Sequence, residues 1–370
     1  YSTDSGNNNN DILYIVRCGN AACSSGNSSP VAIDSLHGKG YQDIAIGSDG
    51  LPVISYGYGG IDIIKCGNTA CNSGNTTTLS VASGLEHAIK VDSSGLPFLS
   101  VYNSTNGDLL AVSCGTKTCA SGNTTTTIDN SSSIIGKYNS VAIPSDDKPV
   151  ISYYDAQNGN LRIAKCSNTT CTSATKTTLD STGSVGYYTS VVVGTSGQPV
   201  ISYYDLTNGD LKVYQCSNST CTSGSAASID TTNDVGQYTS IVLPSDGQPF
   251  ISYYDNTSAN LRTVKCSDAS CSGAGTALSG VDLGNVSTQF RSVYFTTLNL
   301  NSGSSHLTLD EAGNLVSNGL TAASDNTVVV SADSSTAFVV QSTAGTALLS
   351  ANTTTGALTL GTTTGTGTIT

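Results

Sequence analysis

The sequence predicts an all-β protein: a six-bladed β-propeller with four antiparallel strands in each blade, followed by a β-rich stem. Twelve cysteines form six C-x4-C pairs that recur every 48 to 52 residues. Between these pairs each repeat holds four short apolar runs separated by turn sequences, the pattern of four antiparallel strands. The abundance of Gly, Ser, Thr and Asn also favours short strands and turns over helices.

The repeat that begins at Gly236 shows how each blade is built. Its predicted strands cover residues 240–243, 250–254, 261–266 and 276–281. A Ser-Asp-Gly-Gln-Pro turn joins the first two strands, where Gly supplies positive φ and Pro fixes the start of the second strand. A hairpin of the type Asp-x-x-Asn-Gly-Asp joins the second and third strands, and the C-x4-C loop joins the third and fourth.

The two ends of the repeat region predict how the ring closes. The chain opens with residues 1–4, matching the end of a second strand, and residues 11–18 match a third strand. The missing first strand reappears at 289–294, which aligns with 237–242. We therefore expect a propeller over residues 1–295, closed by strand 289–295. Two alternatives stay open: a solenoid, whose end repeats would need caps, and a seventh blade upstream of Tyr1.

Residues 296–370 have a different character and are predicted to form a stem or assembly segment. No Lys or Arg follows Arg291, and the cysteine repeat stops. Apolar runs at 298–300, 307–309, 328–330, 338–340, 348–349 and 358–360 alternate with Gly-containing turns. They are too sparse for a core of their own, so we expect the stem to pack on another chain or on the propeller. Disorder is the alternative, and residues 361–370 are either unstructured or a strand donated to a neighbour.

The cysteine pairs predict local disulfides and an extracellular compartment. Zinc is the rival interpretation, but each repeat supplies only two thiols, and the three histidines are scattered. The expected bridges are Cys18–Cys23, Cys66–Cys71, Cys114–Cys119, Cys166–Cys171, Cys216–Cys221 and Cys266–Cys271.

Composition excludes several classes of partner. The formal net charge is −12 and only 11% of residues are charged, which disfavours nucleic-acid binding. No run approaches 18 apolar residues, so no membrane span is expected. Several Asn-x-Ser/Thr sequences would make the protein a glycoprotein if its source glycosylates them. They begin at Asn27, Asn75, Asn103, Asn123, Asn130, Asn168, Asn218, Asn256, Asn285 and Asn352.

The loops after the second and fourth strands emerge on one face, and this face carries the candidate ligand-binding residues. Tyrosine rings beside carboxylates and amides suit sugar stacking and hydroxyl recognition. The candidates are Tyr154, Asp155, Asn158, Tyr204, Asp205, Asn208, Tyr254 and Asp255, with Tyr138, Tyr188 and Tyr238 nearby. The alternative is structural: the Asp-x-x-Asn-Gly sequence forms the hairpin, and the tyrosines pack between blades. No cofactor is expected, although the same loops could collect Ca²⁺ through carboxylate and carbonyl oxygens.

No catalytic residues are predicted. A glycosidase needs paired carboxylates, and no repeat carries an unmatched pair of glutamates. The sequence also lacks G-x-S-x-G, P-loop and H-E-x-x-H motifs. Glu86 and His87 are the one acid–histidine neighbour pair at a position where other repeats have Tyr-x, and variation in a surface or inter-blade loop is the simpler reading.

The core P-V-I-S-Y-Y-D-x-x-N-G-D-L-K, together with C-x4-C, resembles propeller-repeat surface proteins of uncultured, candidate-phylum-type bacteria over residues 1–295. The segment 338–361 is similar to stalks of bacterial surface fibres and phage tail fibres. The resemblance implies an extracellular fibre or adhesive role and supplies no catalytic residues.

The leading functional hypothesis is therefore a structural or adhesive subunit of an extracellular fibre or filament, assembled through strand contacts of the stem. Its partners would be copies of itself, as a homo-oligomer or filament, and possible further partners are cell-surface glycans. The alternative is a lectin-like, carbohydrate- or receptor-binding propeller on a cell surface or phage fibre, and a glycosidase is the remote alternative. Composition does not separate a trimeric stalk from a helical filament.

Overall fold

The computed structural model describes residues 12–20, 25–34, 40–57, 59–269, 271 and 276–277, and the strand segments 306–309, 315–318, 338–341, 347–352, 357–362 and 365–369. The described residues contain strands and turns and no helix. They divide into two compact units, Tyr1–Ser292 and Val293–Thr370.

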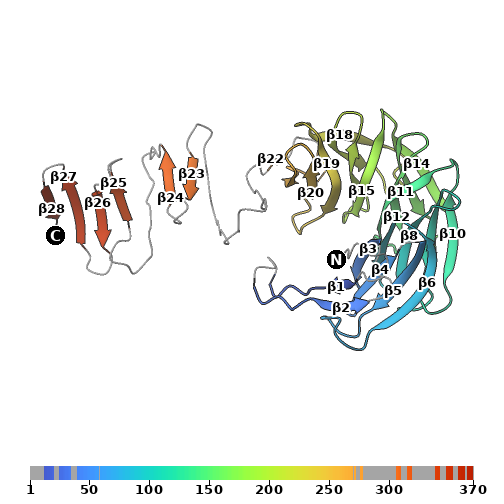
Figure 1. Ribbon diagram of the computed structural model, residues 1–370. Coiled ribbons are helices and arrows are strands. Elements are labelled where there is room, and N and C mark those ends of the chain that lie inside the picture. Colours follow the sequence, from blue (N-terminus) through green and yellow to red (C-terminus); the bar gives the residue numbers. More distant parts are fainter. Residues whose placement is uncertain are drawn as a thin grey trace. The chain divides into compact units, whose positions relative to one another are not determined.

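The first unit is a β-propeller whose blades follow one another along the chain (Figure 1). Blade 1 is represented by two strands, β1 (Leu13–Ile15) and β2 (Val31–Asp34). Blade 2 contains β3 (Tyr41–Ile46), β4 (Pro52–Gly57), β5 (Gly59–Lys65) and β6 (Thr76–Gly84). Blade 3 contains β7 (His87–Val91), β8 (Pro97–Asn103), β9 (Asp108–Ser113) and β10 (Thr124–Asp129).

The later blades repeat this plan. Blade 4 contains β11 (Ile135–Ala142), β12 (Val150–Asp155), β13 (Asn160–Cys166) and β14 (Ala174–Asp180). Blade 5 contains β15 (Val185–Val193), β16 (Pro199–Asp205), β17 (Asp210–Cys216) and β18 (Gly224–Asp230). Blade 6 contains β19 (Val235–Val242), β20 (Phe250–Asp255), β21 (Asn260–Lys265) and β22 (Thr276–Ala277).

Each four-stranded sheet is antiparallel, with its strands in sequence order, as predicted. The first strands of consecutive blades contact one another, β3 with β7, β7 with β11, β11 with β15 and β15 with β19, so they form the inner wall of the ring. The second strands of blades 4 and 5 are buried along their whole length, because neighbouring blades cover both faces. This explains why these strands are apolar on both faces instead of alternating.

The second unit contains two further sheets. One pairs β23 (His306–Leu309) with β24 (Leu315–Asn318). The other joins β25 (Phe338–Gln341), β26 (Ala347–Asn352), β27 (Ala357–Thr362) and β28 (Gly365–Ile369) in sequence order. For residues 361–370 the sequence left two alternatives, an unstructured segment or a strand donated to a neighbour. The structure has strand β28 here, and it pairs with β27 of the same chain. The predicted runs at 298–300 and 328–330 lie outside the described residues, as does the predicted domain boundary at 295.

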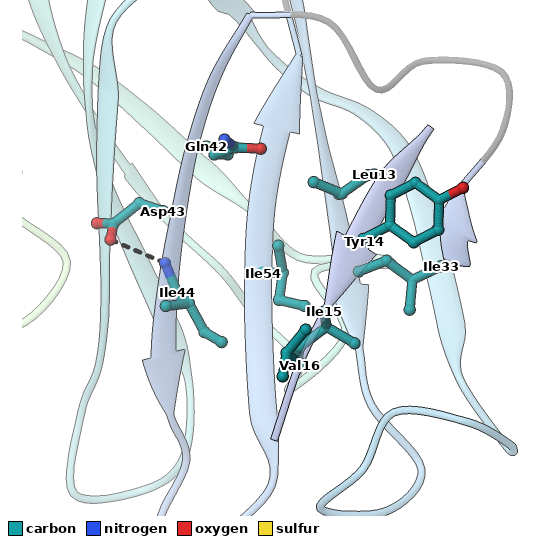
Figure 2. A pocket seen from close by; sticks show the side chains of 9 residues that line it. All are labelled: Leu13, Tyr14, Ile15, Val16, Ile33, Gln42, Asp43, Ile44 and Ile54. Carbon is teal, nitrogen blue, oxygen red and sulfur yellow. Dashed lines mark hydrogen bonds between the residues drawn. The ribbon is translucent and has the colours of Figure 1, made fainter. Parts of the chain in front are cut away.

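An apolar groove of about 330 Å³ runs beside β1. Figure 2 shows Leu13, Ile15 and Ile33 on one side, with Ile44 and Ile54 on the other. Ile44 of β3 is 46% exposed there. The groove lies where the sequence places the first and second strands of blade 1. Both predicted strands, 289–295 and 1–4, lie outside the described residues, so closure of the ring stays a prediction.

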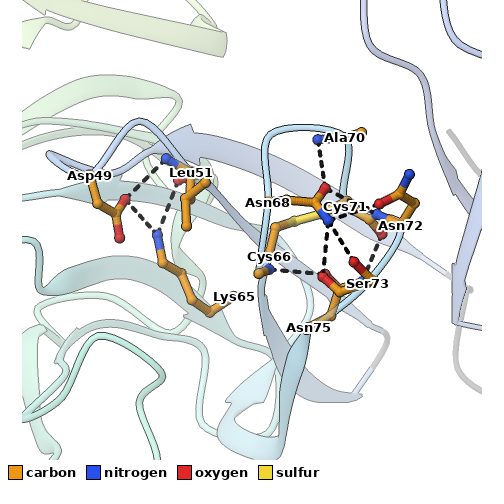
Figure 3. Close-up of a disulfide and its surroundings, with 11 residues drawn as sticks. Asp49, Leu51, Lys65, Cys66, Asn68, Ala70, Cys71, Asn72, Ser73 and Asn75 are labelled. Atoms are coloured by element: carbon orange, nitrogen blue, oxygen red, sulfur yellow. Dashed lines mark hydrogen bonds and ion pairs between the residues drawn. A yellow bond between two sulfur atoms is a disulfide. The ribbon is translucent and has the colours of Figure 1, made fainter.

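A disulfide closes the loop between the third and fourth strands in blades 2 to 6. Cys18 is also bonded, but its predicted partner Cys23 lies outside the described residues. In blade 2 the loop between Cys66 and Cys71 is held by Asn68, whose side-chain oxygen accepts the Ala70 N–H at 2.9 Å (Figure 3). The second cysteine has positive φ in all five loops. Closing such a short loop adds about 2 kcal/mol to the free energy of unfolding in the chain-entropy model. The bridges indicate a secreted or extracellular protein.

An ion pair lies beside this loop in three blades. In blade 2 the Lys65 ammonium donates to Asp49 at 2.8 Å and to the Leu51 carbonyl at 3.2 Å (Figure 3). The hydrogen bond from Lys65 holds the pKa of Asp49 below its ordinary value. Blades 4 and 6 repeat the pair as Lys165–Asp146 and Lys265–Asp246.

A buried tyrosine–aspartate hydrogen bond joins one blade to the next. The last residue of the fourth strand is an aspartate, and it accepts a hydrogen bond from the hydroxyl of a tyrosine in the second strand of the following blade. The bonds are Tyr153–Asp129 at 2.7 Å, Tyr203–Asp180 at 2.7 Å and Tyr253–Asp230 at 2.8 Å. Tyr56 and Asp34 make the same contact between blades 1 and 2.

A cation from the third strand completes this network. The Lys212 ammonium lies 2.7 Å from Asp180 and 3.7 Å from Asp205. Arg162 and Arg262 occupy the same position in blades 4 and 6. Burial opposes the ionisation of Asp180, but the hydrogen bonds from Lys212, Thr182 and Tyr203 outweigh it and hold its pKa below the ordinary value.

The interface between blades 2 and 3 replaces the whole network with apolar side chains. Val101 and Leu110, which pair across β8 and β9, occupy the positions of the tyrosine and the cation. Ala82 occupies the aspartate position, because it pairs with Ile61 as Asp180 pairs with Leu161. Since all three members change together, no charge is left unpaired in this apolar interface.

We expect Asp180→Asn to lower the free energy of unfolding by about 2 to 4 kcal/mol at pH 7, because Lys212 loses its carboxylate. The folded pKa of Asp180 is depressed, so its stabilising effect is present above the unfolded value of about 3.9 and is lost as the pH falls through the folded value. The variant should therefore lose less stability than the wild type between pH 5 and pH 2.5. Urea unfolding at several pH values measures both effects. Asp108→Asn, at a partly exposed hairpin residue, is the control; equal effects of the two variants would contradict the assignment.

Candidate functional site

A repeated β-bulge shapes the start of the inner strands of blades 4, 5 and 6. In each blade a glycine stands two residues before a tyrosine, in the sequences Ile-Gly-Lys-Tyr, Val-Gly-Tyr-Tyr and Val-Gly-Gln-Tyr. This glycine has a φ between 103° and 107°, and the pairing register shifts on both sides of the next residue. At Gly136 a Cβ atom would lie 2.8 Å from the Cβ of Leu109 in the preceding blade. Close approach between blades therefore requires glycine here.

The bulge places a tyrosine in the left-handed backbone region in each of these blades. Tyr138, Tyr188 and Tyr238 have φ values of 50°, 54° and 50°. A bulky residue rarely adopts this conformation, and doing so costs about 1 to 3 kcal/mol. Three successive repeats retain the same strained tyrosine, which indicates that the position of the ring matters.

Register places five residues at equivalent positions, each in the inner strand of one of blades 2 to 6 or, for Glu86, directly before it. We call this set the mouth ring: Tyr41, Glu86, Tyr138, Tyr188 and Tyr238. The ring centroids of Tyr138 and Tyr188 are 4.7 Å apart, and those of Tyr188 and Tyr238 are 4.3 Å apart. The three rings thus form a continuous aromatic surface, on which Tyr238 is 65% exposed.

Side chains that are far apart in the sequence contribute to the raised pKa values of tyrosines at the mouth ring. Burial raises the pKa of Tyr138 to about 12, with further contributions from Glu86, Tyr187, Tyr41 and Tyr238. Burial likewise raises the pKa of Tyr154 to about 12. The phenols are therefore neutral at physiological pH and present hydroxyl donors as well as ring faces.

A cavity of about 520 Å³ lies among the inner strands. Its polar lining includes Asp43, Lys90, Ser140, Ser190 and Ser240, one residue from each of blades 2 to 6. Several of these side chains also join neighbouring strands: Asp43 accepts the Ile89 N–H at 2.8 Å, and Ser190 accepts the Ile241 N–H at 3.2 Å. Several of these polar groups therefore already form hydrogen bonds between neighbouring inner strands.

Glu86 directly precedes the inner strand of blade 3, and His87 is the first residue of that strand. Glu86 occupies the mouth ring, and its carboxylate accepts the N–H of Tyr138. His87 points into the interface with blade 2, is 7% exposed, and has its Nδ1 atom 3.1 Å from the Leu85 carbonyl. Burial lowers the pKa of His87, so the imidazole is neutral near pH 7. Both residues thus make contacts between blades, in keeping with the inter-blade form of the structural interpretation, and Glu86 also lies among the tyrosines.

The predicted aspartates stabilise their own hairpins. Asp155 is 1% exposed and accepts the side-chain and backbone N–H groups of Asn158 at 2.8 and 3.2 Å. Asp205 and Asn208 make the same contacts in blade 5. In blade 6 the buried Asp255 pairs with Arg262 at 2.7 Å. Asn158 and Asn208 themselves are exposed. The hairpin role is visible, and a role of these residues in ligand binding stays a prediction.

The predicted tyrosines lie directly behind the mouth ring. Tyr154 and Tyr204 are each 3% exposed, and the Tyr204 hydroxyl donates to Asp234 at 2.6 Å. Their rings contact those of the mouth: the centroids of Tyr138 and Tyr154 are 6.0 Å apart, and those of Tyr238 and Tyr254 are 6.4 Å apart. Tyr154 and Tyr204 are therefore less accessible than Tyr238, which is exposed, and than Tyr138 and Tyr188, which are half-buried. Whether this face binds a ligand stays a prediction. The Gly-x-Tyr spacing in three repeats is the signal that could have identified the more accessible tyrosines.

Among the residues the structure describes, no group of three or more His, Cys, Asp or Glu side chains is arranged to hold a metal ion. The Asp155 carboxylate, a ligand in the calcium hypothesis, lies 3.8 Å from Arg162. Over the same part of the chain, no helix is long and apolar enough to cross a membrane.

Several solved enzyme structures are similar to this chain. A polysaccharide lyase of family PL25, an ulvan lyase bound to -[GlcA(1-4)Rha3S]-, matches with a TM-score of 0.50 and 11% identity, covering 70% of this chain and 76% of the lyase. An α-L-arabinofuranosidase from Lactobacillus brevis matches with a TM-score of 0.39 and 13% identity, over 59% of this chain and 83% of the enzyme. An exo-β-1,3-galactanase from Phanerochaete chrysosporium matches with a TM-score of 0.41 and 10% identity, over 66% of this chain and 64% of the enzyme.

At these identities the likeness to the lyase shows the propeller fold alone. No protein-family model and no curated protein matches the sequence. The proposed resemblance to surface-fibre proteins therefore stays an expectation.

We expect Tyr238→Asn to leave the free energy of unfolding unchanged or to raise it by up to about 1 kcal/mol, because Asn tolerates positive φ and the lost ring is mostly exposed. The matched variant Tyr203→Asn, at a fully buried tyrosine, should cost about 3 to 5 kcal/mol. Urea unfolding compares the two. A large loss of stability in Tyr238→Asn would show that the tyrosine is retained for folding and not for a ligand.

Proposed function

We propose that this protein is an extracellular carbohydrate-binding propeller whose ligand stacks on the tyrosines of the mouth ring. The observation that carries the proposal is the repeated left-handed conformation of Tyr138, Tyr188 and Tyr238, which holds three touching rings at the inner strands at a cost to stability. Strain of this kind gathers at functional sites, and nothing in the hairpins or the disulfide loops requires it.

The chemistry of the mouth ring suits a glycan. Sugar rings offer apolar C–H faces that stack on tyrosine and hydroxyls that exchange hydrogen bonds with phenols and carboxylates. The exposed ring of Tyr238 and the half-buried rings of Tyr138 and Tyr188 give an aromatic surface with polar edges.

Binding is favoured over hydrolysis because of the charge pattern. A glycosidase uses two carboxyl groups on either side of the scissile bond. Within the described residues the mouth ring contains a single carboxylate, Glu86, and the nearby hairpin aspartates are committed to Asn158, Asn208 and Arg262. A glycosidase therefore remains the remote alternative.

We expect Tyr188→Ala and Tyr238→Ala each to weaken glycan binding about tenfold, equivalent to about 1.4 kcal/mol, because each removes one stacking face. Isothermal titration against a panel of oligosaccharides measures the dissociation constants. Leu79→Ala changes an exposed residue on the fourth strand of blade 2 and serves as the control. A wild-type affinity that survives both tyrosine substitutions would place the glycan elsewhere.

A second candidate function is that of a structural or adhesive subunit of a fibre, and the unit Val293–Thr370 favours it. The sheet β25–β28 pairs in simple sequence order, so its outer strands β25 and β28 each have one edge that pairs with no described strand. Such edges are suited to pairing with another copy of the chain.

We expect electron microscopy of native protein to show filaments or stalks that a chain ending at residue 298 does not form, because the truncation removes these strand edges. Size-exclusion chromatography of the truncated chain should give a monomer. Discrete monomers of the full chain at high concentration would contradict assembly and leave the glycan-binding role as the stronger one.

A further inference from the structure

The mouth ring departs from tyrosine at one place, Glu86 of blade 3. Pairing of His87 with Val101 and of Ala88 with Ser100 places Glu86 in the register that Tyr138 has before Ser140. A carboxylate thus replaces a phenol between Tyr41 of blade 2 and Tyr138 of blade 4. The other four members of the mouth ring are tyrosines, so Glu86 makes one side of the ring chemically different from the rest.

Glu86 is fixed by contacts to three blades. Its carboxylate accepts the Tyr138 N–H and forms a hydrogen bond with the Tyr41 side chain. Its carbonyl accepts the Tyr102 N–H at 2.8 Å and the Asn139 side-chain amide at 3.1 Å. The carboxylate therefore has a defined position with acceptor capacity to spare, since two oxygens offer about four lone-pair sites.

The charged and titratable groups around Glu86 are few. Tyr41 lies on β3, Tyr102 on β8, and Lys137 and Tyr138 on β11, while His87, the residue after Glu86, begins β7. The Lys137 ammonium lies 5.6 Å from the centroid of the Tyr102 ring. Asp43 acts electrostatically on the neutral His87. One cation therefore offsets Glu86, inside a protein of net charge −12.

Resting on the proposed glycan-binding function, we propose that Glu86 determines specificity: it accepts hydrogen bonds from hydroxyls of a neutral sugar residue stacked on the adjacent tyrosines, and it rejects sugars that carry carboxylate or sulfate. Hydrogen bonds to an ionised carboxylate are roughly twice as strong as neutral ones. An anionic sugar at the same place would bring like charges together in a partly desolvated setting, which disfavours binding.

The same geometry gives binding a pH dependence. Burial raises the pKa of Glu86 above its ordinary value, and the Tyr138 N–H, Lys137 and Tyr41 only partly oppose this. The carboxylate accepts hydroxyl donors only while ionised, so affinity is full above the raised pKa and falls as the pH drops through it. The decline should begin at a higher pH than an exposed glutamate, with its pKa of about 4.3, would give.

The test is isothermal titration of the full chain with neutral hexasaccharides (cellohexaose, xylohexaose, laminarihexaose and mannohexaose) and with the acidic hexagalacturonate, from pH 7.5 to pH 4.5. We expect the wild type to bind a neutral hexasaccharide at least tenfold more tightly than hexagalacturonate, with affinity falling at acidic pH. Glu86→Gln keeps an acceptor for the Tyr138 N–H, and it should weaken neutral binding about tenfold, remove the pH dependence and narrow the preference against hexagalacturonate.

Two further variants sharpen the test. Glu86→Tyr restores the residue of the other blades, and it should lose both the pH dependence and the preference for neutral sugars. Asp210→Asn is the matched control, because Asp210 also has a pKa raised by burial but bonds Ser228 on the outer strands of blade 5. It should keep the wild-type profile. Thermal unfolding of each variant checks that the fold is intact.

The outcomes separate the two proposals. Neutral binding that is unchanged in affinity and pH profile by Glu86→Gln would overturn the role of Glu86 and leave the glycan-binding function standing. Tighter binding of hexagalacturonate by the wild type would do the same. If no sugar in the panel binds the wild type, the proposed function fails and the role of Glu86 fails with it.

Discussion

The hydrogen bond between a buried tyrosine and the aspartate that ends the preceding blade organises the propeller. Tyr153, Tyr203 and Tyr253 each place a hydroxyl on such an aspartate, and a lysine or arginine neutralises the pair. Because the bond joins the fourth strand of one blade to the second strand of the next, it fixes how consecutive sheets stack. The spacing of the inner strands, and with it the position of the mouth ring, follows from that stacking.

Blade 3 departs from the repeat at several points. Its interface with blade 2 replaces the polar network with Val101 and Leu110. Its inner strand begins without the glycine bulge, so Glu86 reaches the mouth from a different backbone path than Tyr138 does. Glu86 also has a cation nearby, because Lys137 of blade 4 acts on its carboxylate. Blade 3 therefore differs from the other blades both in its interface with blade 2 and in the residue that it places in the mouth ring.

Much of the fold could be predicted from local chemistry. Cysteine spacing, Pro after a tight turn and Asp-x-x-Asn-Gly hairpins each act within a few residues, so they identified the strand order and five of the bridges. The site was harder because it depends on contacts between blades. The Gly-x-Tyr spacing marks Tyr188, but the spacing alone shows neither its positive φ nor the close approach of Gly186 to Leu161 of the preceding blade. For Asp155 the sequence left two interpretations open, a ligand-binding carboxylate and a hairpin residue. The contacts with Asn158 show the hairpin role, and ligand binding stays a prediction.

The positions of the disulfides affect how the number of repeats in such a chain can change during evolution. Every described bridge joins two cysteines five positions apart within one blade. A gene duplication or deletion that adds or removes one whole repeat would therefore leave no cysteine unpaired and would not change the pairing of the other cysteines. The number of repeats can drift while the covalent chemistry of each remains complete, and a single altered copy, such as the one with Glu86, can acquire a new role without disturbing the others.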